Sequence, residues 1–308
     1  MQNGFIIIYF KMKKIKETRA YFITVPAQEE FENYRTSANR QLLLTMIYDE
    51  NGNLLEDHKY DNWGKLLGKT VYRYDNQNNR ISEETFDPED NLEERTTFEF
   101  ENNKPVKGYI HYLDDSKDEI LFHYNQSGKL IMKEWISDEG EIDKTEQFVF
   151  SGDQLVLHKI TEEGETILKN EFKRDENGNI LEFTYDDKED FYRQVNEFDS
   201  NGKLISSLKY NDEAKLTQNE QFTYDEHDNQ IGIVRQTARG ITKIHNTFTD
   251  GKISSSSEME YNQEDKLIRQ IDRYFDETGE LTELRVYDTG WGQEPLKKYM
   301  IVYENDLY

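Results

Sequence analysis

The sequence contains no cysteine, only four prolines and few hydrophobic residues, which make up 35% of its 308 positions. Without cysteine the chain has neither a disulfide framework nor thiol chemistry. Its mean hydropathy of −0.97 approaches the values of disordered chains. However, its 20 tyrosines and 17 phenylalanines recur at a regular spacing. We therefore expect a folded protein with a thin core, such as a sheet that extends along one axis.

Positive charge is also scarce, because 38 Lys and Arg stand against 63 Asp and Glu and leave a net charge of −25. Such a surface repels nucleic acid phosphates and anionic membranes, so we expect neither as a partner. The charge favours a basic protein as partner, or it serves only to keep a sheet-rich molecule soluble.

The apolar run from Phe5 to Phe10 is short. It cannot span a membrane or form a normal signal-peptide core, and three lysines follow it instead of preceding it. We interpret the run as a β-strand; alternatively, translation begins at Met12. In either case no export signal is evident, so the sequence predicts a cytoplasmic protein.

The chain repeats a motif of an aromatic residue, Asp, two polar residues, Gly, one further residue and Leu. The Asp side chain can accept a backbone N–H two residues on, and Gly takes the left-handed conformation that the second strand needs. Each copy therefore predicts a β-hairpin. Asn78, Asp90, Asp228 and Asp265 replace the Gly and tolerate positive φ, whereas Lys104 and Ala214 fit less well. The clearest copies are residues 48–54, 60–66, 124–130, 198–204 and 275–281.

A calcium-binding loop is the alternative interpretation of this motif, since Asp49, Asn51 and Asn53 alternate like ligands. The calcium loop of helix-loop-helix proteins has its Gly sixth and a bidentate Glu twelfth. Counted from Asp49, Gly52 comes fourth, and no Glu stands at the required offset. We therefore predict turn chemistry, with no metal and no other cofactor.

The aromatic residues before these turns recur mostly every 12 or 14 residues, and every second one recurs every 24 to 27. This spacing leaves about eight residues for each strand, and a period of this size is typical of a repeat array. We predict an all-β fold: an antiparallel β-hairpin repeat array of about ten units of ~25 residues, in one large curved sheet that forms a spiral or a partly closed shell. Residues 1–40 would form an N-terminal cap of short strands with a short helix or loop, and residues 41–308 the repeat domain.

Many predicted strands are apolar at both ends and charged in the middle of the same face. A dry two-layer core would not bury such charges, so we expect two aromatic belts with a wet strip between them. The candidate partner-binding residues are four carboxylates and one tryptophan on these strands: Glu94, Glu134, Glu146, Glu220 and Trp135.

The Tyr-Asp-x-x-Gly-x-Leu units resemble the YD repeats of Rhs and teneurin proteins, over about residues 42 to 308. The resemblance implies a curved β-sheet, which in the large members forms a hollow shell around a cargo domain. This chain departs from their pattern because the Arg usual after the Gly is replaced, as by Asn53 and Lys65. No self-cleavage junction or toxin domain follows the repeats, so the resemblance implies a small stand-alone relative.

No catalytic motif stands out, since the sequence has no Gly-rich phosphate loop, no Ser nucleophile elbow and no His-Glu-x-x-His. His111 and His123 would lie at opposite ends of neighbouring strands, too far apart to share a metal. We therefore predict that the chain is not an enzyme. The first hypothesis is an acidic immunity or antitoxin-type protein that binds and neutralises a basic toxin domain. The alternative is an exported cell-surface or envelope repeat protein that binds glycans.

Overall fold

The computed structural model describes residues 14–36, 39–289 and 297–308. In these ranges the chain forms 22 β-strands and one 3-10 helix, η1 (Phe31–Asn33). The pairs β1–β2, β2–β3, β1–β22, β20–β21 and β21–β22, and the successive pairs from β5–β6 to β16–β17, are all antiparallel. The prediction of an all-β antiparallel fold is therefore confirmed. The apolar run from Phe5 to Phe10 and the alternative start at Met12 lie outside the described residues.

The chain divides into two compact units, which we describe separately. Unit 1 comprises residues 1–70, 245–259 and 267–308, and unit 2 comprises residues 71–244 and 260–266. The strands of unit 1 are β1 (Ile15–Thr24), β2 (Gln41–Tyr48), β3 (Leu54–Tyr60), β20 (Leu267–Phe275), β21 (Leu281–Asp288) and β22 (Lys297–Leu307). Three strands have residues in both units: β4 (Leu66–Tyr74), β18 (Gly240–Thr249) and β19 (Lys252–Asn262).

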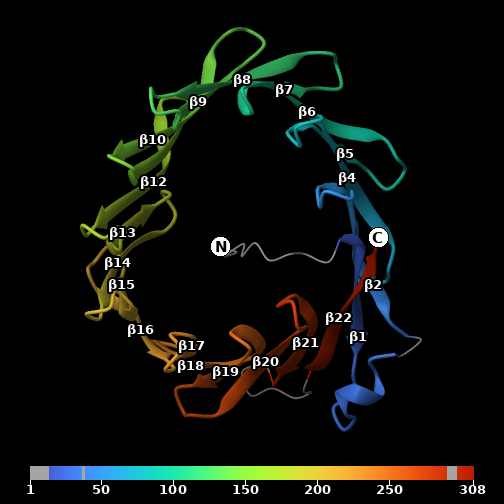
Figure 1. Cartoon of the computed structure of the whole chain (residues 1–308), viewed down its shortest axis with the longest axis vertical. Helices are drawn as coiled ribbons and strands as arrows, with labels where there is room; N and C mark the ends of the chain where they lie inside the picture. The colour runs from blue at the N-terminus through green and yellow to red at the C-terminus, as the bar shows by residue number, and fades with distance from the viewer. Residues whose placement is uncertain (1–13, 37–38, 290–296) are drawn as a thin grey trace. The chain divides into compact units, whose positions relative to one another are not determined.

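Unit 2 is a meander in which each strand from β5 to β16 pairs with the next strand in the sequence. Figure 1 shows these strands in sequence order along a curved sheet. Their bounds are β5 (Arg80–Phe86), β6 (Leu92–Glu101), β7 (Lys104–His111), β8 (Lys117–Tyr124), β9 (Leu130–Ile136), β10 (Ile142–Ser151), β11 (Gln154–Glu162), β12 (Glu165–Arg174), β13 (Ile180–Asp186), β14 (Phe191–Phe198), β15 (Leu204–Tyr210), β16 (Leu216–Tyr224) and β17 (Gln230–Thr237).

In unit 1 the first and last strands are neighbours, because β1 pairs with β2 on one side and with β22 on the other. The strand order is therefore β20, β21, β22, β1, β2, β3. A small core of Ile23, Val25, Phe31, Met300 and Val302 lies where the segment after β1 packs against β22. The division of the chain at residue 40 into a cap and a repeat domain stays a prediction.

The turns have the local chemistry that the motif predicts. At residues 48–54 the amide of Asn51 donates to Asp49 Oδ1 over 2.8 Å, and Gly52 has a φ of 87°. The amide of Gly52 also donates to the Asp49 carbonyl, and the strand register shifts at Tyr48. This is a type I turn followed by a left-handed residue that forms a bulge. Asn78, Asp90, Ala214, Asp228 and Asp265 also have positive φ in place of Gly.

Lys104 does not take the Gly place of a longer turn. Instead β6 ends at Glu101 and β7 begins at Lys104, so the turn consists of Asn102 and Asn103. Both have positive φ, 51° and 60°, which is the conformation of a two-residue type I′ hairpin turn. Asn tolerates this conformation better than other non-glycine residues.

Neighbouring turns on the same edge of the sheet are linked through side chains. Lys104 Nζ donates to the carbonyl of Gly128 over 2.7 Å, and Lys129 Nζ to that of Gly152 over 3.1 Å. The residues joined in this way are 23 to 25 positions apart in the sequence. Further links of this kind are Asn79 to Asn103, Lys188 to Glu165, Lys203 to Asp228, Lys252 to Glu277 and Asn305 to Glu280.

Candidate functional site

One face of the unit 2 sheet carries a row of rings and charges around Trp135. Phe98, Gly108, Ile120, Trp135 and Lys144 stand directly opposite one another on five consecutive strands, β6 to β10. Because side chains alternate along a strand, residues two positions away from these share their face. We call this surface of β5 to β17 the Trp135 face. It also carries Phe122, Lys133, Glu146, Phe148, His158, Asn170, Phe172, Phe183, Tyr185 and Tyr192.

The charges in the middle of this face are paired. Lys133 Nζ lies 2.7 Å from Glu146 Oε2, and His158 Nε2 lies 2.8 Å from Glu146 Oε1. Burial raises the pKa of the Glu146 carboxyl, but the hydrogen bonds from Lys133 and His158 outweigh burial and hold that pKa below its ordinary value. Farther along, Arg235 Nε lies 2.6 Å from Glu220 Oε1. The wet strip is therefore a line of half-buried ion pairs.

The rings of the Trp135 face contact one another across neighbouring strands. Phe148 stacks on His158 with ring centroids 4.9 Å apart, and Tyr185 stacks on Tyr192 at 5.1 Å. Lys209 Nζ lies 3.5 Å from the Tyr192 ring centroid, and burial lowers the pKa of that amine. These contacts hold planar surfaces and polar groups side by side on one sheet.

A pocket of about 420 Å³ opens on the β5 to β9 part of this face, and we call it the aromatic pocket. Phe98 and Phe122 meet edge to face, with centroids 6.4 Å apart. Two cations border the rings: Arg80 Cζ is 6.0 Å from the Phe98 centroid, and Lys133 Nζ is 5.9 Å from that of Trp135. The lining residues are Arg80, Phe98, Phe100, Pro105, Ile120, Phe122, Lys133 and Trp135.

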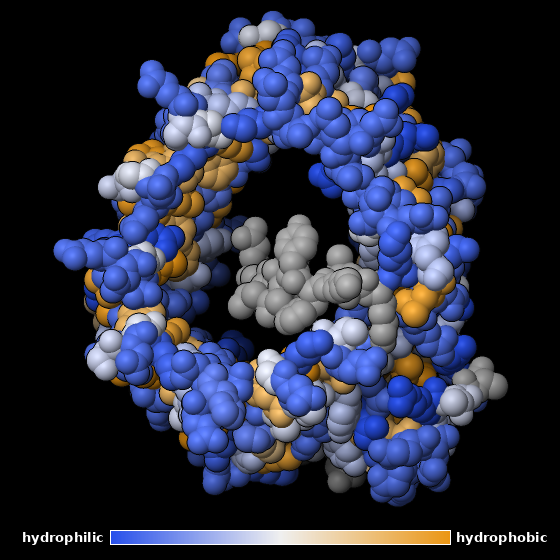
Figure 2. Space-filling model, viewed as in Figure 1, coloured by the Kyte–Doolittle hydropathy of each residue, from blue (hydrophilic) through white to orange (hydrophobic). Residues whose placement is uncertain are grey.

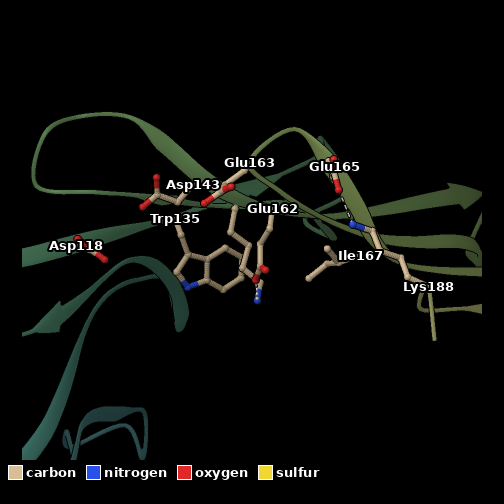
Figure 3. A pocket seen from close by; sticks show the side chains of 9 residues that line it. Asp118, Trp135, Asp143, Glu162, Glu163, Glu165, Ile167 and Lys188 are labelled. Atoms are coloured by element: carbon tan, nitrogen blue, oxygen red, sulfur yellow. Dashed lines mark hydrogen bonds and ion pairs between the residues drawn. The ribbon is translucent and has the colours of Figure 1, made fainter. Parts of the chain in front are cut away.

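Trp135 also lines a second pocket, of about 640 Å³, which we call the acidic pocket (Figure 3). Five of its residues are acidic and two are lysines. Lys144 Nζ pairs with Glu162 at 2.8 Å, and Lys188 Nζ pairs with Glu165 at 2.7 Å. The pocket therefore keeps a surplus of negative charge. Its lining consists of Asp118, Trp135, Asp143, Lys144, Glu162, Glu163, Glu165, Ile167 and Lys188.

At the rim of the acidic pocket, Tyr112 donates its hydroxyl hydrogen bond to Asp118. This bond, followed by burial, raises the pKa of Tyr112 to about 12. Figure 2 shows that most side chains on the visible surface are hydrophilic, with hydrophobic residues in separate patches. A negatively charged surface with few apolar patches binds charged or polar ligands more readily than apolar ones.

The structure brings most of the sequence-predicted binding residues onto one face. Strand registers place Trp135, Glu146, Glu94 and Glu220 on the Trp135 face. Glu134 lies on the opposite face, where its Oε2 is 2.6 Å from His123 Nε2. The binding role of these residues stays a prediction.

Sequence reasoning missed Arg80, Phe98 and Lys133. The signal that could have revealed Arg80 is a departure from the motif. Arg80 occupies the last motif position, directly after the turn, and other copies have a leucine there, such as Leu54, Leu66 and Leu92. Phe98 and Lys133 could be found only from strand register, which brings them with Trp135 to the lining of one pocket.

Unit 1 has its own pocket, of about 480 Å³, beside β1 and β22. Its polar side chains bond to one another: Thr18 donates to Asn305 over 2.7 Å, and Asn305 donates to Glu280 over 3.2 Å. No helix among the described residues is long and apolar enough to cross a membrane. In the same residues no group of three or more His, Asp or Glu side chains could hold a metal ion.

Neither a protein-family model nor a curated protein matches this chain. Among solved structures, a porin-like protein from Bacteroides uniformis is 8% identical, with 95% of this chain and 98% of that chain covered and a TM-score of 0.36. A porin-like protein from Bacteroides vulgatus is 10% identical, with the same coverage and a TM-score of 0.23. These likenesses concern the backbone fold alone and assign neither a partner nor an activity to this chain.

A third match is TcdB2-TccC3 without its hypervariable C-terminal region, at 12% identity and a TM-score of 0.27. It covers 83% of this chain but only 19% of that chain, so this chain spans about a fifth of that protein. TccC3 also occurs in the matching Tc holotoxin pore of Photorhabdus luminescens, at 12% identity and a TM-score of 0.22, with 80% of this chain and 19% of that chain covered. These matches agree in part with the resemblance to YD-repeat proteins.

The comparisons correct one expectation, the cytoplasmic location. The structures that match over nearly the whole chain are porin-like proteins, so the prediction of a cytoplasmic protein is wrong and is withdrawn. It rested only on the lack of a recognisable export signal near Phe5 to Phe10, which lies outside the described residues.

Proposed function

We propose that this chain is a non-catalytic binding protein that is exported to the cell envelope and holds a glycan on its Trp135 face. The observation that carries the proposal is that rings from β6 to β14 share one face with the ion pairs of β9 to β11. A sugar ring presents an apolar C–H surface, which packs on an aromatic ring, while its hydroxyls bond to charged and amide groups. Half-buried rings such as Trp135 and Phe122 provide the aromatic surface for the sugar ring. Lys133, Glu146 and Asn170 provide the charged and amide groups for its hydroxyls.

The proposal is tested by calorimetry with soluble oligosaccharides and polysaccharides. We expect Trp135→Ala to weaken binding at least tenfold, because it removes a ring shared by two pockets. Trp63→Ala is the matched control, since Trp63 is 84% exposed in a turn of unit 1. Binding that is unchanged by Trp135→Ala, or no binding by any glycan tested, would contradict the proposal. Cell fractionation tests the export part separately, and recovery in the cytoplasm would refute it.

A second candidate is the binding of a basic protein, such as a toxin domain, and the acidic pocket favours it. The chain carries a net charge of −25, and the pocket has five carboxylates against two lysines. Complementary charge speeds association and makes affinity fall with added salt. The test is capture of a basic partner by the wild type and by Asp143→Asn/Glu163→Gln, with Asp250→Asn/Glu264→Gln as an equally charged control. Binding that does not depend on salt or on the first pair would count against it.

We also propose that the hairpins form an array of YD type, as a small stand-alone relative. The side-chain links between turns 23 to 25 residues apart support this, since equivalent positions of successive units would be joined in this way. The test is exchange of turn residues 125–129 with residues 199–203, which preserves the motif. A fold that survives the exchange supports equivalent units, whereas an unfolded variant contradicts them.

A further inference from the structure

The aromatic pocket differs in charge from the rest of the chain. The whole sequence has 63 acidic against 38 basic residues, yet the lining of this pocket includes Arg80 and Lys133 and no carboxylate. In a protein of net charge −25, this lining favours anionic over cationic ligands, and the carboxylate partners of the two cations, Glu83 and Glu146, lie outside the lining.

A glycine lets one of the pocket's rings lie against the backbone of the sheet. A Cβ at Gly108 would lie 3.1 Å from Phe98 Cδ1 and 3.3 Å from Ile120 Cβ, so the Phe98 ring reaches over the backbone of β7. Phe98, Gly108, Ile120 and Trp135 follow one another on adjacent strands, which makes a platform about 14 Å across at a strand spacing of about 4.8 Å. A chain of sugar rings fits such an elongated platform better than a compact ion does.

Arg80 stands at one end of the platform and is held loosely. Its guanidinium lies 5.6 Å from the Tyr72 centroid and 6.0 Å from that of Phe98, and it pairs with Glu83 at 3.2 Å. Both partners of that pair are well exposed, at 46% and 36%, and exposed pairs contribute little stability. A ligand carboxylate can therefore replace Glu83 at small cost and accept two parallel N–H bonds from the guanidinium.

Lys133 stands at the other end, and its charge is shared with Glu146 at 2.7 Å. An ammonium group has three N–H donors, so one or more remain for a ligand hydroxyl or carboxylate. We infer that the aromatic pocket binds an acidic oligosaccharide, with sugar rings on Phe98 and Trp135 and a sugar carboxylate on Arg80. This inference rests on the proposed glycan binding and narrows its ligand to carboxylate-bearing sugars.

The experiment compares oligogalacturonate and hyaluronan oligosaccharides with their methyl esters, which keep the rings and remove the charge. We expect each acid that binds to bind at least tenfold more tightly than its ester, with an affinity that falls as salt rises. Arg80→Leu introduces the residue that other motif copies have, and it should abolish the preference for the acid over the ester. Arg80→Lys should retain part of that preference. Arg239→Gln, in an exposed turn, is the control of equal charge.

The two levels of the proposal fail in different ways. Equal affinity for acid and ester, or a preference that survives Arg80→Leu in a folded variant, overturns the acidic-sugar inference and leaves glycan binding intact. Absence of binding by every acidic and neutral oligosaccharide overturns both. Circular dichroism of the variants establishes that they retain the β-sheet.

Discussion

The ring of Phe98 on β6 covers the backbone of Gly108 on β7, so closely that a Cβ added at Gly108 would require the ring to shift. A Cβ on Gly108 would come within 3.1 Å of Phe98 Cδ1 and 3.2 Å of Phe98 Cε1. Gly108 faces Phe98 directly in the strand register and is buried. The glycine thus sets the position of a ring on which the aromatic pocket depends.

Gly108→Ala is expected to displace the Phe98 ring and destabilise the protein by about 1–3 kcal/mol, as overpacking does in other proteins. Denaturant unfolding measures the effect. The same substitution in a Phe98→Ala background should cost much less, because the clashing ring is gone. An equal cost in both backgrounds would show that Phe98 is not the neighbour that Gly108 accommodates.

Glu146→Gln is expected to destabilise the protein by about 1–2 kcal/mol at pH 7, between the values for exposed and buried ion pairs. It leaves Lys133 and His158 without their shared carboxylate. Unfolding by urea measures the loss. Glu171→Gln is the control, because Glu171 is half exposed and pairs with Lys169 on the opposite face. That variant should stay within about 0.5 kcal/mol of the wild type.

The cost of Glu146→Gln should also depend on pH. The folded-state pKa of Glu146 lies below its ordinary value of about 4.3, so the folded protein holds the ionised form more strongly. The stabilisation is fully present above the unfolded pKa and is lost as pH falls through the folded pKa. We expect the stability difference between wild type and variant to shrink below about pH 4.3. A difference that stays constant to pH 3 would contradict the pairing.

The turn carboxylate of Asp75 leads to a second acid-dependent prediction. The side-chain amide and then the backbone amide of Asn79 donate to it, and both lower its pKa. Asp75→Ala removes the acceptor and should destabilise the hairpin at pH 7. The loss should shrink as the pH falls through the lowered pKa of the folded protein, because the wild type then loses its charged acceptor as well. Asp75→Asn is the control, because Asn125 serves the same turn role with its amide oxygen. Thermal unfolding at pH 7 and at acidic pH measures whether Asp75→Ala lowers the melting temperature more at pH 7 than in acid.

Tyr112 should titrate separately from most of the tyrosines. Its hydrogen bond to Asp118, followed by burial, raises its pKa to about 12. Asp118→Asn should return that pKa toward 10, because a neutral amide no longer favours the protonated phenol. Alkaline absorbance titration of wild type and variant measures the shift, and Tyr112→Phe identifies the residue. A spectrum in which Tyr112→Phe removes a group that titrates near 10 would show that the bond is absent in solution.

The candidate site was only partly predictable. Trp135 and Glu146 could be found from the sequence, but Glu134 was expected to act with Trp135 although adjacent residues of a strand point to opposite faces. Arg80 was overlooked because its importance depends on the rings beside it. Those rings come from β6, β8 and β9, and no local pattern of residues determines which strands lie side by side.

The sequence by itself determined the hairpins. In the turns of Asp49 with Gly52 and of Asp75 with Asn78, all the determining residues lie within five positions. The carboxylate accepts a hydrogen bond from the amide two residues on, and the left-handed φ belongs to a single residue, so both are local properties. Only the tertiary structure decided that β1 pairs with β22, that Phe98 covers Gly108, and that Arg80 and Lys133 flank the same rings. These contacts join residues distant in sequence, and strand register, set by bulges at the turns together with packing across strands, selects them.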